Sequence, residues 1–166
     1  MAGHEKPPGR VTVAYVGVGA NLGDPRATLA AAVAALGELG EVRAVSPLYE
    51  TDPVGLEDQP VFLNGAVALA TSLDPYALLD ALLAIEARFG RERTVRWGPR
   101  TLDLDLLAMD GVELDDPGLT VPHPRLAERE FALRPLADVA PGLLVDGVAV
   151  AERLAALPPQ GVRPAG

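Results

Sequence analysis

The segment RWGPRTLDLDLL, residues 96 to 107, places two arginines shortly before two aspartates. Asp103 and Asp105 alternate with leucines, so on a strand both carboxylates share the face opposite the apolar one. Two such carboxylates repel each other unless a cation lies between them. Hard oxygen ligands on a rigid strand suit Mg²⁺ bound together with substrate phosphates. A solvated polar face of a sheet is the simpler alternative for the aspartate pair by itself.

Arginines crowd the stretch directly before this strand, namely Arg91, Arg93, Arg96 and Arg100. Guanidinium groups bind phosphate oxygens through paired hydrogen bonds and stay charged at physiological pH. Salt bridges to the aspartates are the alternative use, but four arginines against two carboxylates leave the excess of positive charge that a polyphosphate with its metal needs. The glycines of GVGANLG, residues 17 to 23, lack the Lys-Ser/Thr of a P-loop and add only weak support.

Several further side chains could take part in ligand binding. Trp97 either packs internally or closes over such a ligand. Phe62 and Asn64 lie two residues apart on an expected strand and so face one way, which suits a heterocycle, although core packing is the alternative for Phe62 and for Phe131. His123 stands between two prolines in VPHPR, and both a ligand role and a plain surface role stay open for it.

The composition limits the class of protein. The chain has 166 residues, of which 49% are hydrophobic, a net charge of −9 and no cysteine. This length predicts a single domain, which we place at residues 11–160 after a flexible tail at 1–10. The acidic charge argues against binding to nucleic acid or to a membrane surface, and the longest apolar runs are too short to span a bilayer. Without an export signal the expected location is the cytoplasm, and we expect a monomer.

The positions of helix-starting Asp-Pro pairs and helix-ending glycines predict the order β-α-β-β-α-β. Asp-Pro pairs begin two helices, with Asp24 and Asp74 as N-caps and the following proline at the first helical position. Gly40 and Gly90 are expected to end them. The expected strands cover residues 11–20, 41–51, 61–71 and 102–107. This order predicts an α+β fold with a ferredoxin-like core, followed by a C-terminal extension with a short helix near 125–138 and a weak strand at 143–149.

The signature RWGPRTLDLDLL resembles that of the 6-hydroxymethyl-7,8-dihydropterin pyrophosphokinase family. Three supporting blocks follow the same order between about residues 11 and 145: YVGVGANLGD, SPLYETDPVG with DQPVFLNGAV, and LTVPHPRLAEREFAL. The resemblance implies transfer of the β,γ-pyrophosphoryl group of ATP to the hydroxymethyl group of a reduced pterin, with release of AMP, in folate biosynthesis. It also implies two Mg²⁺ ions, and ATP and 6-hydroxymethyl-7,8-dihydropterin as the partners.

The resemblance further implies roles for individual residues. Asp103 and Asp105 would hold the metals and, with Arg96 and Arg100, carry the chemistry. The residues expected at the pterin are Asn21, Thr51, Val54, Phe62, Asn64, Trp97 and Phe131. Those expected at ATP are Glu86, Arg91, Arg93, Arg96, Arg100, Thr120, His123 and Arg129.

The sequence departs from better-known members at a few positions. Phe62 replaces a tyrosine, Pro124 stands where an aromatic often follows the histidine, and Gly118 stands where a basic residue can lie. The arginine-rich loop is one residue shorter. A non-catalytic nucleotide- or small-molecule-binding module of the same fold is the alternative function, but such a module has no evident need for two metal-binding acids.

Overall fold

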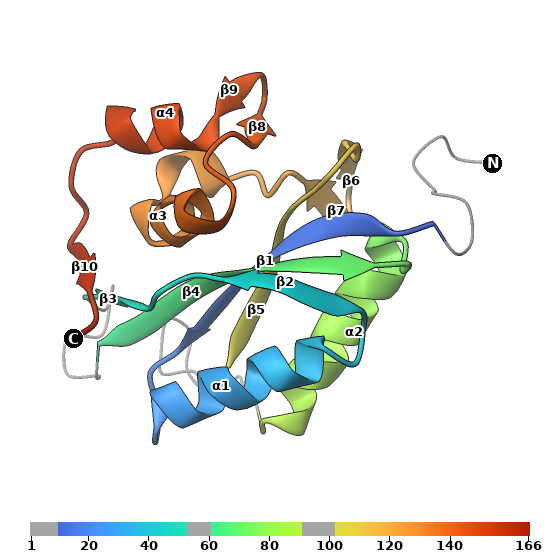
Figure 1. Cartoon of the computed structure of the whole chain (residues 1–166), viewed down its shortest axis with the longest axis horizontal. Coiled ribbons are helices and arrows are strands. Elements are labelled where there is room, and N and C mark those ends of the chain that lie inside the picture. The colour runs from blue at the N-terminus through green and yellow to red at the C-terminus, as the bar shows by residue number, and fades with distance from the viewer. Residues whose placement is uncertain (1–9, 53–60, 91–101) are drawn as a thin grey trace.

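The computed structural model describes residues 10–52, 61–90 and 102–166. In these residues an antiparallel sheet of six strands lies between helices on both of its faces. Figure 1 shows α1 and α2 on one face, and α3 and α4 on the other. The helices are α1 (Pro25–Leu36), α2 (Pro75–Arg88), α3 (Glu130–Val139) and α4 (Val150–Ala156). The α+β class that the sequence predicts is therefore confirmed, and the sheet is antiparallel.

Strand β1 (Thr12–Ala20) runs through the middle of the sheet. It pairs antiparallel with β4 (Phe62–Thr71) on one side and with β5 (Asp103–Met109) on the other. Strands β2 (Glu41–Val45) and β3 (Tyr49–Thr51) both pair with the far side of β4, and β10 (Val162–Pro164) continues the sheet beyond β3. The strand that carries the two aspartates therefore lies next to the central glycine-containing strand.

The Asp-Pro pairs begin helices as the sequence predicts. Asp24 Oδ1 accepts a hydrogen bond from Ala27 N at 3.2 Å, and Asp74 Oδ1 accepts one from Ala77 N at 2.9 Å. These bonds satisfy amides that have no partner within the helix. The expected end of the first helix at Gly40 is wrong, because α1 ends at Leu36 and Gly37 is its C-cap.

The expected single strand at 41–51 is in fact two strands. Ser46 N donates to Ala66 O and Ala66 N donates to Ser46 Oγ, both at 2.9 Å, so a side chain replaces part of the ladder at the break. Pro47 follows and has no amide hydrogen to donate. The break separates β3, which continues toward the predicted site, from β2.

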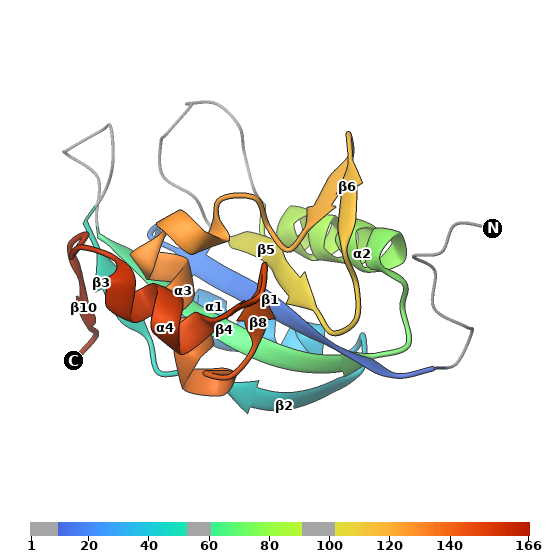
Figure 2. The same cartoon turned by 90° about the horizontal axis from the view of Figure 1, so that it is seen from above.

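The C-terminal extension contains more structure than the sequence predicts. The expected helix at 125–138 is a 3₁₀ turn (Leu126–Glu128) followed by α3, and the weak strand at 143–149 is a small hairpin of β8 (Leu144–Val145) and β9 (Val148–Ala149). The Asp-Asp-Pro-Gly turn joins β6 (Leu114–Asp116) to β7 (Leu119–Val121). Helix α4 and strand β10 were not predicted. Figure 2 shows the extension lying over the sheet, with β10 beside β3.

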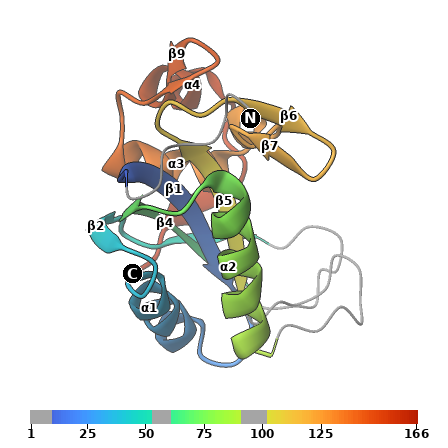
Figure 3. The same cartoon turned by 90° about the vertical axis from the view of Figure 1, so that its right-hand side faces the viewer.

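Two apolar cores lie on opposite faces of the sheet. One contains Val16, Leu82 and Leu104 and is covered by α1 and α2, which lie side by side in Figure 3. The other contains Leu133 and Leu136 and is covered by α3. None of the helices in the described part of the chain has the length and apolar character that crossing a membrane requires.

Candidate active site

Residues from three adjacent strands line up on the face of the sheet that α3 covers. Gly19 of β1 lies opposite Asn64 of β4 on one side and opposite Asp103 of β5 on the other. Gly17 lies opposite Asp105 in the same way. Side chains at directly opposed positions share a face. The two glycines therefore form a floor without side chains between an amide and a pair of carboxylates.

The approach of Asn64 to this floor explains why β1 carries a glycine there. A Cβ atom on Gly19 would lie 2.8 Å from Asn64 Oδ1, which is closer than such contacts allow. Asn64 Nδ2 donates to Thr51 Oγ1 at 2.8 Å. The amide group is therefore oriented from both sides, with its oxygen over β1 and its nitrogen toward β3.

The two predicted stacking residues belong to the same side of the sheet. Phe62 precedes Asn64 by two residues in β4, so the alternation of side chains puts both on the α3 face. Phe131 lies in the first turn of α3 and packs at the edge of the core beneath that helix. The guanidinium carbon of Arg129 lies 5.6 Å from the centre of the Phe131 ring. α3 in turn packs against β4.

The aspartate pair is held by an element on the opposite face. Glu86 of α2 is only 3% exposed, and its Oε2 accepts a hydrogen bond at 2.7 Å from the amide of Leu104, the residue between Asp103 and Asp105. This bond satisfies an amide of β5 and holds the strand where the two aspartates leave it. The resemblance implies that Glu86 lies at ATP, and this role stays a prediction beside the bond to Leu104.

The donor set fits Mg²⁺ shared with a substrate. Asp103 is partly buried and Asp105 is exposed. Within residues 10–52, 61–90 and 102–166, no group of three or more His, Asp or Glu side chains could hold a metal by itself. One or two carboxylates completed by phosphate oxygens are the usual ligands of Mg²⁺ in phosphoryl-transfer sites.

A bulge in β5 positions His123. The pairing of β1 with β5 shifts between Tyr15 and Val16, leaving Leu107 as the extra residue, and Leu107 O accepts a hydrogen bond from His123 N at 2.8 Å. Desolvation by burial lowers the pKa of His123, and the charges of Arg129 and Arg125 lower it further. The ring is therefore neutral at pH 7.

The same ring has a defined tautomer. Arg125 N donates to His123 Nδ1 at 3.2 Å, so the proton of the neutral ring lies on Nε2. His123 and Thr120 both line an open hollow of about 680 Å³ beside the β6–β7 hairpin. The structure therefore brings these two residues of the expected ATP set together.

The remaining expected residues divide into two groups. Asn21 directly follows β1 and is only 2% exposed, at the end of the strand that carries Gly19. The others lie outside the described residues: Val54, Arg91, Arg93, Arg96, Trp97 and Arg100. Sequence reasoning missed the polar anchors of α3, which are Tyr49, Glu130, Asp138 and Gln160, because their partners are far apart in the chain.

Comparison with known proteins identifies the family. Residues 15–141 match the family model of 7,8-dihydro-6-hydroxymethylpterin-pyrophosphokinase. The chain belongs to this family. The prediction made from the RWGPRTLDLDLL signature is thereby confirmed.

Individual members of the pyrophosphokinase family are closely similar to this chain. The 2-amino-4-hydroxy-6-hydroxymethyldihydropteridine pyrophosphokinase of Pseudomonas aeruginosa is 54% identical over 151 residues, which cover 89% of this chain and 93% of the relative. The enzyme of the same name from Bacillus subtilis is 50% identical over 129 residues, 76% of this chain and 77% of the relative.

Solved structures agree with the fold. The Plasmodium falciparum HPPK-DHPS crystal structure with pteroate has a TM-score of 0.71 at 15% sequence identity. The match covers 91% of this chain and 43% of that longer chain. At this identity the likeness concerns the fold alone.

Proposed function

We propose that this protein transfers the pyrophosphoryl group of ATP to the hydroxymethyl group of 6-hydroxymethyl-7,8-dihydropterin and releases AMP, a step in folate biosynthesis. The observation that carries the proposal is the family match over residues 15–141, together with relatives named as pyrophosphokinases at 54% and 50% identity. The arrangement of Asn64, Gly19 and Asp103 across three adjacent strands supports it.

The pterin would lie over the glycine floor between Phe62 and Phe131. Asn64 is oriented by its hydrogen bond to Thr51, and its amide would form hydrogen bonds with the polar edge of the heterocycle. An amide with a fixed orientation discriminates between ligands, because a bound ligand that covers it without pairing leaves a polar group unsatisfied. Asn21 at the end of β1 would complete this side of the site.

The phosphates would lie on the side of the two aspartates. Asp103 and Asp105 would hold Mg²⁺, which neutralises phosphate charge when bound. His123 is neutral, and its Nε2–H would donate to a phosphate oxygen or to the nucleotide, with Thr120 nearby in the same hollow. Arg91, Arg93, Arg96 and Arg100 are proposed as the cationic partners of the transferred group on the basis of sequence.

No nucleophilic side chain is needed for this reaction. The pterin hydroxyl oxygen forms a bond to the β-phosphorus of ATP and releases its proton to solvent. The bond from that phosphorus to the α,β-bridging oxygen breaks, and AMP leaves with that oxygen. The contribution of the chain is to orient the two substrates and to balance charge. The stacked ring and the oriented amide would fix the hydroxymethyl group, and the aspartate side would fix the phosphates.

We also propose that the core is ferredoxin-like and forms one domain over residues 11–160. The order of elements β1, α1, β2 with β3, β4, α2 and β5 supports this, as does the position of β1 and β4 between the outer strands. In such an arrangement the face opposite α1 and α2 is open to an added layer. Here the C-terminal extension supplies that layer with α3.

The test of the function is conversion of ATP to AMP with and without 6-hydroxymethyl-7,8-dihydropterin. We expect AMP and the pterin pyrophosphate in equal amounts, only when the pterin and Mg²⁺ are both present. ATP binding without pterin-dependent AMP would instead support the non-catalytic module, which the names of the relatives do not favour.

A further inference from the structure

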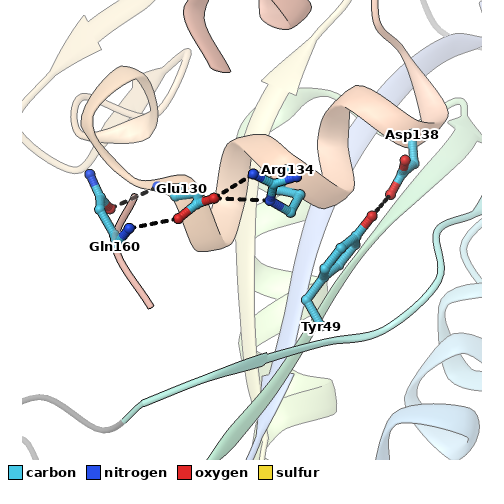
Figure 4. A network of polar contacts seen from close by, with 5 residues as sticks. All are labelled: Tyr49, Glu130, Arg134, Asp138 and Gln160. Carbon is cyan, nitrogen blue, oxygen red and sulfur yellow. Dashed lines mark hydrogen bonds and ion pairs between the residues drawn. The ribbon is translucent and has the colours of Figure 1, made fainter. Parts of the chain in front are cut away.

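A reciprocal pair of hydrogen bonds ties the start of α3 to the C-terminal segment. Glu130 N donates to Gln160 Oε1 at 2.9 Å, and Gln160 N donates to Glu130 Oε1 at 2.8 Å. Gln160 Nε2 also donates to Glu128 O at 2.8 Å. Figure 4 shows Gln160 lying against Glu130 at the first turn of the helix. Three bonds therefore join two segments that are about thirty residues apart.

The side chain of Gln160 caps the N-terminus of α3. The residue at the N-cap position, Arg129, makes no side-chain cap hydrogen bond. The first amides of a helix have no partner within it, and an outside acceptor stabilises them. Gln160 Oε1 takes the amide of Glu130 from a different segment, so the position of this turn depends on where residue 160 lies.

Glu130 makes this junction rigid. Its side chain is only 6% exposed, and Arg134 Nη2 lies 2.5 Å from its Oε2. Burial acts to raise the pKa of Glu130, but hydrogen bonds from Arg134 and from the amides of Gln160 and Val162 outweigh this and lower the pKa. The carboxylate stays charged and satisfied, and such a buried network has one favoured geometry.

The same segment continues directly onto β3. Val162 pairs with Thr51 in the β10–β3 ladder, and Ala165 N donates to Leu48 O at 3.0 Å. At its other end α3 is also tied to β3, because Tyr49 Oη donates to Asp138 Oδ2 at 2.5 Å. Figure 4 shows these two anchors at opposite ends of the helix. The helix is therefore held at both ends relative to the strand that carries Thr51.

The position of α3 affects the proposed pterin site between Phe62 and Phe131, which we call the pterin slot. Phe131 follows Glu130 immediately, and Thr51 orients Asn64. A ring stacked between two aromatic side chains needs a fixed separation of those side chains, and a misplacement of about 1 Å at a reacting substrate can cost ~100-fold in rate. The anchor at Gln160 sets the position of the first turn of α3, and thereby that of Phe131.

We infer that Gln160 is a positioning residue for the pterin site, acting through Glu130 on Phe131. This inference rests on the proposed function. Gln160 touches neither substrate, and its contribution is the placement of α3 against β3. Loss of its side chain widens or tilts the slot without changing the side chains that line it.

The experiment is the substitution Gln160→Met, which removes the amide and nearly keeps the length. Pterin binding is measured at equilibrium in the presence of Mg²⁺ and a non-hydrolysable ATP analogue. We expect about tenfold weaker pterin binding, with binding of the ATP analogue unchanged within about twofold. The matched control is Arg153→Ala, which breaks the bond from Arg153 Nε to Val145 O (2.8 Å) elsewhere in the C-terminal extension. That variant should bind pterin as the wild type does.

A double-mutant cycle separates positioning from a general structural effect. In a Phe131→Ala background, Gln160→Met should weaken pterin binding by less than about twofold, because the residue through which it acts is gone. An unchanged pterin affinity in Gln160→Met, or an equal loss in both backgrounds, overturns the inference while the proposed function stands. If the wild type binds no pterin and releases no AMP, the proposed function fails and the inference fails with it.

Discussion

At the scale of single residues, the candidate active site depends on the side chains that flank the two glycines of β1. Gly17 and Gly19 leave the centre of the sheet bare, and the neighbouring strands supply an amide at Asn64 and carboxylates at Asp103 and Asp105. Each of these groups has a different task, so single substitutions should have separable effects on metal, pterin and folding.

Replacing Asp103 or Asp105 with Asn should lower turnover by at least about 100-fold, a loss of roughly 3 kcal/mol in transition-state stabilisation. The substitution removes the charge that would hold Mg²⁺ and keeps the size of the side chain. Because neither aspartate belongs to the two apolar cores, thermal unfolding should barely change. Steady-state kinetics and melting curves check both points. Near wild-type turnover in both variants would rule out a metal-binding role.

Replacing Gly19 with Ala should weaken pterin binding by about 1–2 kcal/mol, a factor of roughly 5–30. The added methyl group would lie 2.8 Å from Asn64 Oδ1, so the amide must turn away from its present position. The control is the same change in an Asn64→Ala background, where the nearest remaining atom is Leu63 O at 3.6 Å. In that background Gly19→Ala should weaken pterin binding only slightly further. Additive losses in binding titrations would contradict this account.

At the scale of elements, the aspartate strand is supported by a helix on the other face of the sheet. The carboxylate of Glu86 crosses from α2 to the amide of Leu104. Loss of the acceptor destabilises the fold more for this buried amide than for an amide exposed to water. Burial prevents a water molecule from taking the place of the lost acceptor. The positions of Asp103 and Asp105 thus depend on a residue that does not belong to their strand.

Replacing Glu86 with Ala should lower the free energy of unfolding by about 1–3 kcal/mol, because the buried Leu104 amide loses its acceptor. Glu86→Gln keeps an oxygen that can accept this bond, so it should retain more stability than Glu86→Ala. Urea unfolding of the two variants measures the difference. Equal stability of both variants, or greater stability of the alanine variant, would show that the bond to Leu104 contributes nothing.

At the scale of the whole molecule, stability should fall as the solution becomes acidic, for two separable reasons. The folded state lowers the pKa of His123 below its ordinary value of 6.5, and that of Glu130 below 4.5. In both cases the unfolded chain takes up a proton more readily than the folded chain. Stability is therefore lost as pH falls, from about 6.5 downward for His123 and only below about 4.5 for Glu130.

Urea unfolding at pH 7.5 and pH 5.5 should isolate the histidine, since Glu130 stays ionised in both states over most of this range. We expect the wild type to lose more stability than His123→Gln between these two pH values. The other histidine of the chain, His4, is present in both proteins and cancels. An identical loss in the two proteins would show that burial near Arg129 and Arg125 does not affect protonation of His123.

Local features of this protein follow from short stretches of its sequence. The Asp-Pro caps lie within one helix turn, the alternation of leucine and aspartate after residue 101 is the pattern of one strand, and the RWGPRTLDLDLL signature is a run of twelve consecutive residues. Such short-range patterns predicted the α+β class and the family, both of which are confirmed, and most of the strands. They failed where a strand breaks at Ser46 and Pro47, because the replacement bonds come from Ala66.

Which distant residues come into contact depends on how the whole chain packs. Alternation places Asp103 and Asp105 on one face of a strand, but the register with β1 and β4 puts them across Gly19 from Asn64. The bond from Gln160 to the start of α3, and the one from Glu86 to Leu104, have no periodic signal in the sequence. Their partners are brought together by the burial of two cores on opposite faces of one sheet, which is a property of the whole chain.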